Sequence, residues 1–573
     1  MTGSTAPPAE EARSGGPAWA PSNRFLARAA LLTAALTAAG ALLGLLRDQL
    51  LARTFGAGPD TDAFLVAWTV PEFASTLLIE DAMALVLVPA FSRALARRAE
   101  AGATGPDPVS GLVRSTLPGT ALGTAAAAAL VAAAAPLLVP LLAPGLPEQR
   151  LAVDCTRLTA TCVLSFALAG YFSAALRAHG RYLAPAAIYV AYNTGIVTAV
   201  VLLGPAWGVR AAATGVAAGG ALMALVQAPS LVRRLRKRAT GAPDRDGSAA
   251  ATGVVLALVA PVIVFAVGRQ SQVLVERFLA APLPAGAISH LNYAQKVAQL
   301  PMVLSLMLCT VSFPVIARAV AAGDREAARH RAERDLLLAG AVVLVGAATV
   351  VAAAPQIVGL LFQRGAFDAA DTAATASVMR VYALGLLGHA LVSALGRCYF
   401  SASRPLWFPA AAMGLGVAAN AALGALWAGR WGTSGIALAN AAGITLTAAL
   451  LLAGTGRQQV PLSARAVVVG LARLAAAAAA ATVAGRLCAS WTADPLLGAA
   501  LAGTAVLVVF VLAAHALRAP CVPHLARVAT RRALPRHRPL PRRRPLPRRH
   551  RHAPTHPAVP LDRDVPLRRH RQG

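Results

Sequence analysis

Charged residues are scarce in this chain of 573 residues: they make up 13% of the sequence, whereas 57% of it is hydrophobic. Soluble globular domains carry roughly twice that share of charge, so the composition argues against a soluble protein. Lipid offers the backbone no hydrogen-bond partners, so apolar stretches of about 20 residues within it must be helical. The composition therefore predicts an all-α polytopic membrane protein.

Cysteine is also rare, and the six cysteines show no Cys-x-x-Cys spacing. The chain has no Walker motif, no His-Glu-x-x-His, no Gly-x-Ser-x-Gly and no soluble segment large enough for a nucleotide-binding domain. We therefore expect no enzyme activity, no cofactor, no cysteine metal site and no disulfide framework. Without an ATPase, transport would draw on an ion gradient or the membrane potential, which buried carboxylates can sense.

Acidic residues are almost missing from the C-terminal segment, residues 519–573, which is rich in arginine and proline and carries much of the net charge of +29. Such a sequence cannot bury a core, so we expect a disordered cytoplasmic tail. Because the charge is terminal, nucleic acid is not an expected partner. Three explanations of the tail stay open: it binds anionic lipid headgroups, it recruits a cytoplasmic protein, or it reflects only an arginine-rich composition.

Hydropathy predicts about fourteen spanning helices. They cover residues 26–52, 62–91, 112–140, 152–176, 183–204, 207–229, 250–280, 288–317, 335–362, 373–400, 406–428, 433–455, 464–487 and 494–517. Arginines concentrate in alternate loops, for example in residues 93–98, 233–238 and 318–331, whereas the opposite loops hold mostly single arginines. Since arginine-rich loops stay in the cytoplasm, we expect both termini there, in a bacterial inner membrane.

Reporter fusions at Gly241 and Ala369 test this topology, because the two positions lie in loops assigned to opposite faces. We expect a cytoplasmic reporter to be active at Gly241 and an extracytoplasmic reporter to be active at Ala369. Cytoplasmic activity at both positions would show that the predicted topology is wrong.

The two halves of the chain share a pattern. Pro71 and Pro301 each follow a polar residue, Asp62 and Asn292, by nine positions. A Pro-x-x-x-Arg-Ala-x-Ala motif occurs in each half, at residues 89–96 and 314–321. The copies lie an even number of helices apart, so we expect two lobes related by an axis along the membrane normal, with a site between them.

The expected divisions are a polar N-terminus (1–24), a lobe of helices one to six (25–229), a basic linker (230–249), a lobe of helices seven to twelve (250–455), two additional helices (464–518) and the tail (519–573).

Charged and strongly polar residues inside the predicted spans cluster on helices one, two, seven and eight. Because an intramembrane charge costs about 2.5–3.5 kcal/mol on insertion scales, these side chains must face a cavity or a partner. As a group they indicate a substrate or ion path. For Arg47 alone, a structural ion pair with Asp62 or Glu80 is the alternative. Pro71 is expected to free a backbone carbonyl one turn earlier in its helix.

Four segments carry a resemblance to a known family: residues 44–64, with Gly-Leu-Leu-Arg-Asp and Thr-Asp-Ala-Phe at their ends; 178–185, Ala-His-Gly-Arg-Tyr-Leu-Ala-Pro; 361–367, Leu-Phe-Gln-Arg-Gly-Ala-Phe; and 394–401, Ala-Leu-Gly-Arg-Cys-Tyr-Phe-Ser. Together they resemble the MviN/MurJ family of lipid II flippases. The resemblance implies two six-helix lobes around a cationic cavity, two C-terminal helices that form a lipid-facing groove, and lipid II, a polyprenyl-pyrophosphate-linked sugar, as substrate.

The resemblance and the intramembrane cluster together indicate site residues. The expected substrate-binding residues are Arg47, Asp62, Arg269 and Lys296, and the expected supporting residues are Asp48, Glu80, Gln270 and Glu276. Glu276 and Asn420 roughly match sodium ligands of some members, although the second carboxylate is missing. The family's other substrate arginines are replaced by Ala41, Ser75 and Thr76, and Lys296 keeps a charge but lacks the two-pronged guanidinium that suits a pyrophosphate.

These observations favour a lipid II flippase or close paralogue that works by alternating access, with membrane lipids around it. The replaced arginines keep two alternatives open. One is an exporter of another polyprenyl-linked glycan or of drugs, and a drug exporter predicts an acidic, aromatic-lined cavity. The other is a non-transporting membrane scaffold whose basic tail recruits partners.

Overall fold

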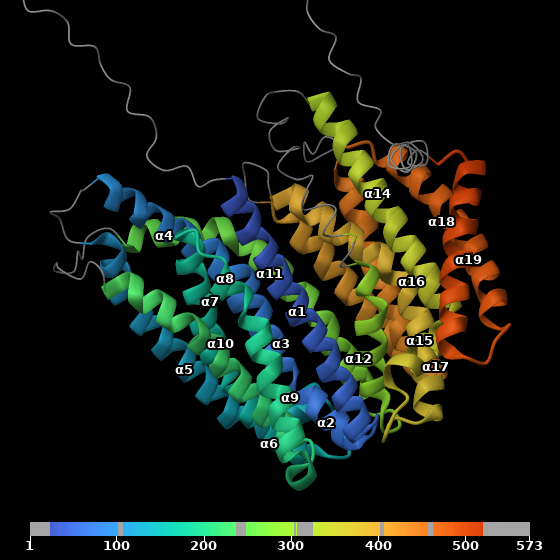
Figure 1. Ribbon diagram of the computed structural model, residues 1–573, viewed down its shortest axis with the longest axis horizontal. Coiled ribbons are helices and arrows are strands. Elements are labelled where there is room, and N and C mark those ends of the chain that lie inside the picture. Colours follow the sequence, from blue (N-terminus) through green and yellow to red (C-terminus); the bar gives the residue numbers. More distant parts are fainter. Residues whose placement is uncertain are drawn as a thin grey trace, which may run out of the picture. The chain divides into compact units, whose positions relative to one another are not determined.

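The computed structural model describes residues 23–100, 107–236, 248–302, 305, 325–400, 406–455 and 462–519. These residues form helices and short connections, without a strand (Figure 1), which confirms the predicted all-α fold. The first half contains α1 (Asn23–Phe55), α2 (Pro59–Ala67), α3 (Thr69–Ala74), the π-helix η1 (Ser75–Asp81), α4 (Ala82–Glu100), α5 (Pro108–Leu142), α6 (Gln149–Ala160), α7 (Cys162–Ala178), α8 (Leu183–Ala186), α9 (Ile188–Trp207) and α10 (Arg210–Arg236).

The second half contains α11 (Ser248–Ala280), α12 (Ala287–Ala298), α14 (Arg325–Ala352), α15 (Ala354–Phe362), α16 (Ala369–Phe400), α17 (Phe408–Gly454), α18 (Ala464–Ala489) and α19 (Pro495–Ala516). Among the described residues, 11 helices are long and apolar enough to cross a membrane, so the chain is a multi-pass membrane protein. The count of about fourteen spans stays a prediction.

Helix α17 consists of two spans that fold back on each other. A Cβ atom at Gly416 in the first part would lie 2.7 Å from the carbonyl oxygen of Gly443 in the second. One straight helix of its 47 residues would extend about 70 Å, more than twice the hydrocarbon thickness of a bilayer. Gly432 interrupts the helical dihedrals with φ 55° and ψ −135°, between the segments 406–428 and 433–455 that hydropathy separates. Glycine is required there because other residues rarely adopt a positive φ.

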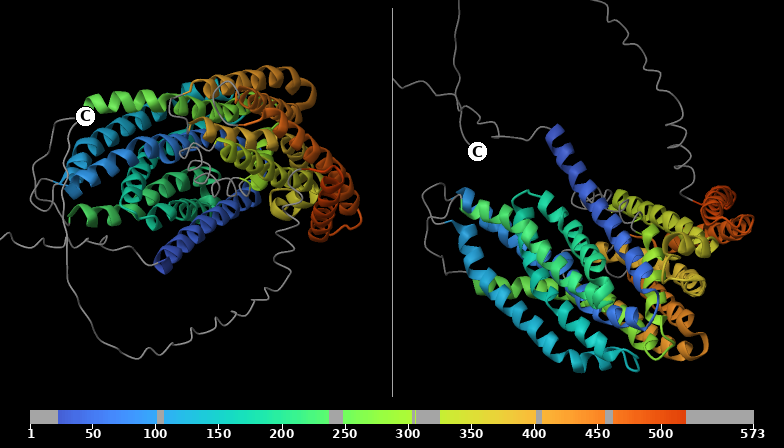
Figure 2. Two further views of the ribbon diagram at one scale, coloured as in Figure 1. Left: turned by 90° about the horizontal axis from the view of Figure 1, so that it is seen from above. Right: turned by 60° about the horizontal axis from the view of Figure 1, so that its bottom comes forward.

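Packing is densest between helices of the same half (Figure 1). In the first half α9 packs against α10 and α1, and in the second half α17 packs against α16 and α11. A Cβ atom at Gly219 of α10 would lie 2.5 Å from the carbonyl oxygen of Tyr192 in α9, so these two helices meet at backbone distance. Helices α18 and α19 pack on each other and on α14, at the outer edge of the second half (Figure 2). The predicted lobe boundaries stay predictions.

The second predicted span is broken near Pro71. Helix α2 ends at Ala67 and α3 begins at Thr69. Because Pro71 has no N–H, the Ala67 carbonyl lacks its intrahelical donor, and it accepts a hydrogen bond from the Thr159 hydroxyl instead (3.1 Å). The freed carbonyl predicted from the sequence is thereby confirmed. In the second half α12 ends at Ala298, shortly before Pro301, and the second copy of the Pro-x-x-x-Arg motif lies outside the described residues.

Candidate functional site

Arg47 is held in place near the C-terminal end of α1. Its guanidinium donates to Asp48 Oδ1 from Nε (3.0 Å) and Nη2 (2.8 Å), and from Nη1 to Asn193 Oδ1 (3.0 Å). The Asn193 amide donates in turn to the carbonyls of Gly40 (3.0 Å) and Tyr189 (2.9 Å), which ties α9 to α1. Both side chains of the Arg47–Asp48 pair are buried, so the guanidinium has a fixed position before any ligand arrives.

Of the two predicted carboxylate partners of Arg47, Asp62 does not pair with it. The ion pair with Asp62 is not formed, because Asp62 is engaged elsewhere, and the Glu80 side chain lies outside the described part of the chain. The carboxylate that pairs with Arg47 is that of Asp48, the next residue in the sequence.

Lys296 of α12 brings a second cation to the same carboxylate, with its Nζ 3.2 Å from Asp48 Oδ1. Both cations lie over the ring of Trp68: the Arg47 Cζ is 4.7 Å and the Lys296 Nζ 5.5 Å from its centroid. The face of an indole ring attracts cations. Arg47, Asp48, Trp68 and Lys296 are named the cationic cluster here. Two cations share one carboxylate, so the cluster has one excess positive charge, and its members come from both halves of the chain.

A narrow cavity opens on the cationic cluster. It is lined by Asp48, Thr61, Trp68, Asn292 and Lys296, together with neighbouring apolar side chains. Its volume of about 10 Å³ is close to what one water molecule needs. A sugar-pyrophosphate headgroup is far larger, so the two halves must separate for such a ligand to reach the cluster.

A second ionic contact joins the halves between α3 and α11. The Arg277 Nη2 lies 2.8 Å from Glu72 Oε2, and its Nη1 donates to the Thr69 hydroxyl. The Gln270 amide donates to the Glu72 carbonyl at 3.5 Å. Gln270 therefore lies at the contact between the halves and contacts the backbone there, and its supporting role stays a prediction.

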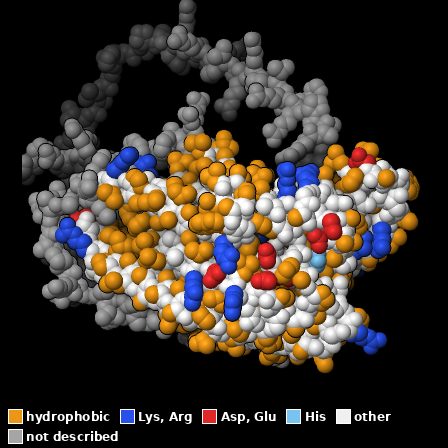
Figure 3. Space-filling view, turned by 90° about the horizontal axis from the view of Figure 1, so that it is seen from below, with side chains coloured by type: hydrophobic (Ala, Val, Ile, Leu, Met, Phe, Trp, Pro, Cys, Tyr) orange, Lys and Arg blue, Asp and Glu red, His pale blue; other side chains and the backbone are white. Residues whose placement is uncertain are grey.

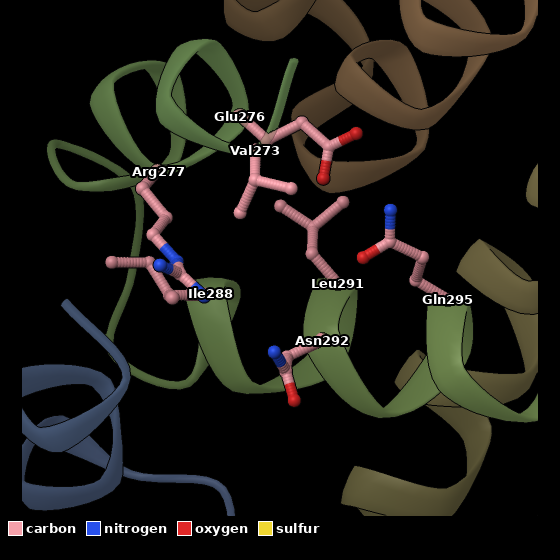
Figure 4. Close-up of a pocket in the computed structure, with 7 residues that line it drawn as sticks. All are labelled: Val273, Glu276, Arg277, Ile288, Leu291, Asn292 and Gln295. Atoms are coloured by element: carbon pink, nitrogen blue, oxygen red, sulfur yellow. The ribbon is translucent and has the colours of Figure 1, made fainter. Parts of the chain in front are cut away.

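Figure 4 shows a further narrow cavity beside this contact, between Glu276 and Arg277 of α11 and Asn292 and Gln295 of α12. Asn292 lines this cavity and the one at the cationic cluster. Its Oδ1 is buried and has no hydrogen-bond partner among the described residues. Asn292 therefore offers a free acceptor between the two cavities.

Asp62 closes one end of the contact between the halves. Its Oδ2 accepts from the Gly286 N–H (2.7 Å), and its Oδ1 accepts from the Ser289 N–H (2.7 Å) and hydroxyl (2.6 Å). These donors are at the N-terminus of α12, where Gly286 is the capping residue with φ 93°. A carboxylate at a helix N-terminus compensates the helix dipole and the unpaired N–H groups. Asp62 thus caps a helix of the other half, and in this conformation its oxygens are occupied.

A backbone contact lies at the same end of the bundle. The Ala366 N–H donates to the Arg53 carbonyl at 2.9 Å. A Cβ atom at Gly365, where φ is 65°, would lie 2.3 Å from that carbonyl oxygen, so only glycine permits the approach. Figure 3 shows this end of the molecule from below, with charged side chains of both signs gathered near its middle. The halves are therefore closed against each other on the side of the loop that joins α1 to α2.

The candidate sodium ligands lie on α11 and α17. Glu276 is buried and accepts a hydrogen bond from the Asn440 amide at 2.6 Å. Asn420 is fully buried, and neither atom of its amide has a partner among the described residues. No group of three or more His, Cys, Asp or Glu side chains in the described ranges could hold a metal ion. One carboxylate with amide oxygens suits a weakly bound monovalent cation better than a divalent one. The assignment of Glu276 and Asn420 as sodium ligands stays a prediction.

Arg269 stands apart from the cationic cluster. It lies on α11 about 12 Å along the helix axis from Arg277, and it forms no hydrogen bond or ion pair with another side chain in the described part of the chain. The half-buried Arg269 carries a positive charge that no carboxylate in the described part of the chain pairs with. The structure thus brings Arg47, Asp48 and Lys296 together, engages Asp62, Gln270 and Glu276 in contacts within the protein, and leaves Arg269 open.

Sequence reasoning missed three contributors: Trp68, Asn193 and Ser289. Asn193 had a usable signal, because it is a lone amide in the apolar segment 183–204, and a buried amide needs a partner. No sequence signal identified Trp68 or Ser289, because their roles depend on contacts between the halves. Two of the replaced family positions, Ala41 and Ser75, carry small side chains. At the third, the Thr76 hydroxyl in η1 donates to the Glu72 carbonyl in α3 (3.2 Å).

The comparisons with known proteins agree with this fold. The family model described as lipid II flippase MurJ matches residues 51–503. The chain is 27% identical to the lipid II flippase MurJ of Burkholderia cenocepacia over 66% of this chain and 73% of that protein, and 28% identical to a probable lipid II flippase MurJ of Rhizobium meliloti over 83% and 89%.

Two solved structures share the fold. A lipid II flippase MurJ in an inward closed conformation superposes with a TM-score of 0.69 at 19% identity, covering 87% of this chain and all of the other. An inward-facing multidrug transporter of the MATE family, in the MOP superfamily, gives 0.60 at 16% identity, covering 75% and 98%. Since the family model spans most of the sequence, this chain belongs to the MurJ family of lipid II flippases.

Proposed function

We propose that this chain is a lipid II flippase that moves a polyprenyl-pyrophosphate-linked sugar across a bacterial inner membrane, with both termini in the cytoplasm. The observation that carries the proposal is the excess positive charge of the cationic cluster, which lies between the two halves and inside the membrane. A buried charge without a counter-charge is costly, and an anionic headgroup would supply that counter-charge. The polyprenyl chain would stay in lipid.

The proposed roles follow from the chemistry of each side chain. Arg47 presents a planar guanidinium, which can contact two oxygens of a pyrophosphate at once. Lys296 adds a point charge, and Arg269 adds a second guanidinium from the other half of the chain. Asp48 and Trp68 hold the two cations of the cluster in place while no substrate is bound.

Alternating access supplies the route. The contacts of Asp62 with α12 and of Arg53 with Ala366 close the side that we assign to the exterior, and the cluster opens toward the cytoplasm when substrate enters. Substrate release outside then requires these contacts to break. Asp62 accepts three hydrogen bonds from two residues of the other half, and we expect all three to form or break together when the halves move.

A second candidate, export of another polyprenyl-linked glycan, rests only on Ala41, Ser75 and Thr76, where the family resemblance leads one to expect arginines. Fewer cations leave fewer bonds to the pyrophosphate and its sugars. The cluster's positive charge argues against a drug exporter, for which an acidic cavity is expected. It argues against an inert scaffold as well, since a structural role alone needs no excess charge.

Substrate-dependent stabilisation of the purified protein separates the two candidates. A ligand at about one hundred times its Kd stabilises a protein by about 2.7 kcal/mol, which is several degrees in the unfolding temperature. We expect lipid II to raise that temperature by more than a polyprenyl pyrophosphate that carries a different glycan. Equal stabilisation by both would favour the broader exporter, and no stabilisation by either would contradict transport of this substrate class.

A further inference from the structure

Asn292 lies on the face of α12 that meets the first half of the chain. Ser289, Asn292 and Lys296 are spaced three and four residues apart, so they share this face of the helix. The Ser289 hydroxyl donates to Asp62 Oδ1 at 2.6 Å. The Lys296 Nζ lies 3.2 Å from Asp48 Oδ1. Both neighbours of Asn292 on this face therefore contact carboxylates of the first half.

The Asn292 side chain has no such contact. It is 8% exposed, and its Oδ1 is buried without a hydrogen-bond partner among the described residues. Thr61, which lines the same cavity, donates its hydroxyl hydrogen to the Gly56 carbonyl at 3.0 Å. A buried polar atom without a partner lowers the stability of this conformation, and an apolar side chain of similar size would avoid that loss. Asn292 is therefore better suited to a conformation in which its amide meets a ligand.

Separation of the two halves would expose Asn292 next to the proposed phosphate site. The residue lines the narrow cavity at the cationic cluster and the one beside Arg277 (Figure 4). The four residues from Asn292 to Lys296 correspond to about 6 Å along the axis of α12. A ligand whose phosphate contacts Lys296 therefore places the group joined to that phosphate beside Asn292.

The chemistry of a free amide oxygen selects that group. The oxygen accepts hydrogen bonds, so it repels the oxygens of an ionised pyrophosphate, which have no hydrogen to donate. Sugar hydroxyl groups and the N–H of an acetylated amino sugar are donors, and an amide nitrogen can donate to their oxygens in return. A free acceptor beside a cationic cluster thus fits a sugar joined to a phosphate rather than the phosphate itself.

We infer that Asn292 is a specificity-determining residue, which recognises the sugar attached to the pyrophosphate once the halves have separated. The inference rests on the proposed function and names the part of the substrate that this residue contacts. The cationic cluster binds the charge that all polyprenyl-pyrophosphate ligands share, and Asn292 distinguishes these ligands by the sugar next to that charge.

Native mass spectrometry of the full chain tests the inference, with lipid II and a polyprenyl pyrophosphate without sugar as the two ligands. The ratio of their dissociation constants is the readout, because both ligands require the same separation of the halves and a shift in that equilibrium cancels. We expect the unmodified chain to prefer lipid II. Asn292→Leu should reduce that preference about fivefold, the effect of one neutral hydrogen bond. Lys296→Gln should weaken both ligands and keep the ratio.

Two further variants serve as controls. Asn292→Gln retains the amide on a longer side chain and should recover part of the preference. Gln363→Leu removes an exposed amide just after α15 and should keep the full preference. If Asn292→Leu does not fold, Asn292→Ala takes its place.

Thermal unfolding without ligand supplies a second readout. Asn292→Leu should unfold at the same temperature as the unmodified chain or at a higher one, because the substitution removes an unsatisfied buried oxygen. A lower unfolding temperature with an unchanged ratio would show that the amide serves only the closed conformation, and would overturn the inference. Equal affinity of the unmodified chain for both ligands would overturn it as well. Binding of neither ligand by the unmodified chain would overturn the proposed function, and the inference with it.

Discussion

Arg47→Lys should yield a folded protein that binds lipid II at least tenfold more weakly. A lysine keeps the charge near Asp48, but it cannot make the paired contacts of a guanidinium with a pyrophosphate. Each charge-assisted hydrogen bond lost is worth about 1.5–3 kcal/mol, and about 1.4 kcal/mol corresponds to a factor of ten in affinity. Thermal unfolding of the purified variant, with and without lipid II, measures fold and binding together. Arg430→Lys, at an exposed arginine on α17, is the matched control.

Arg47→Ala separates a binding role from a structural one. Breaking a buried ion pair usually costs about 3–5 kcal/mol because a charge is stranded. Here Lys296 stays 3.2 Å from Asp48, so we expect a loss below that range. Arg47→Ala/Asp48→Ala should be less stable than Arg47→Ala alone, because it also leaves the Lys296 ammonium without its carboxylate partner. Arg47→Ala protein that is fully stable and transports normally would contradict both roles.

Asp62→Ala should destabilise the protein by about 3 kcal/mol or more. The substitution leaves the Gly286 N–H and both donors of Ser289 without their acceptor in a buried position, and each unsatisfied donor costs about 1–3 kcal/mol. Asp62→Asn keeps one acceptor oxygen and should have an intermediate effect. Chemical or thermal unfolding of the purified variants gives the comparison.

The control for Asp62 is Asp154→Ala. Asp154 pairs with Arg210 at 2.9 Å, but both side chains are more than two-fifths exposed. An exposed pair contributes about 0–1 kcal/mol, so this variant should unfold close to the unmodified chain. Equal losses for Asp62→Ala and Asp154→Ala would show that the cap on α12 has no special role.

The fold was largely predictable because its main signals are local. Long apolar segments fix the helices, and even the break before Pro71 follows from the missing N–H of one residue. The two spans of α17 meet at Gly432, between the segments 406–428 and 433–455 that hydropathy separates. Loop charge predicts the orientation of the helices in the membrane.

The site was predictable as a group of residues and less so as a set of contacts. Intramembrane placement correctly brings Arg47, Asp48 and Lys296 into one region, because charges in lipid must find partners. Which partner each charge contacts depends on how the halves meet. Asp62 faces α12 and accepts hydrogen bonds from its N–H groups, and Arg47 contacts Asp48 and Asn193 instead. The indole of Trp68, which faces both cations, leaves no trace in sequence spacing.

Complementation of a bacterial strain depleted of its lipid II flippase tests the central proposal most directly. We expect expression of this chain to restore growth and normal cell shape, Arg47→Ala to fail although it reaches the membrane at a normal level, and Arg430→Ala to restore growth fully. Failure of the unmodified, correctly inserted chain, or equal rescue by Arg47→Ala, would contradict the proposal that the cationic cluster carries lipid II across the membrane.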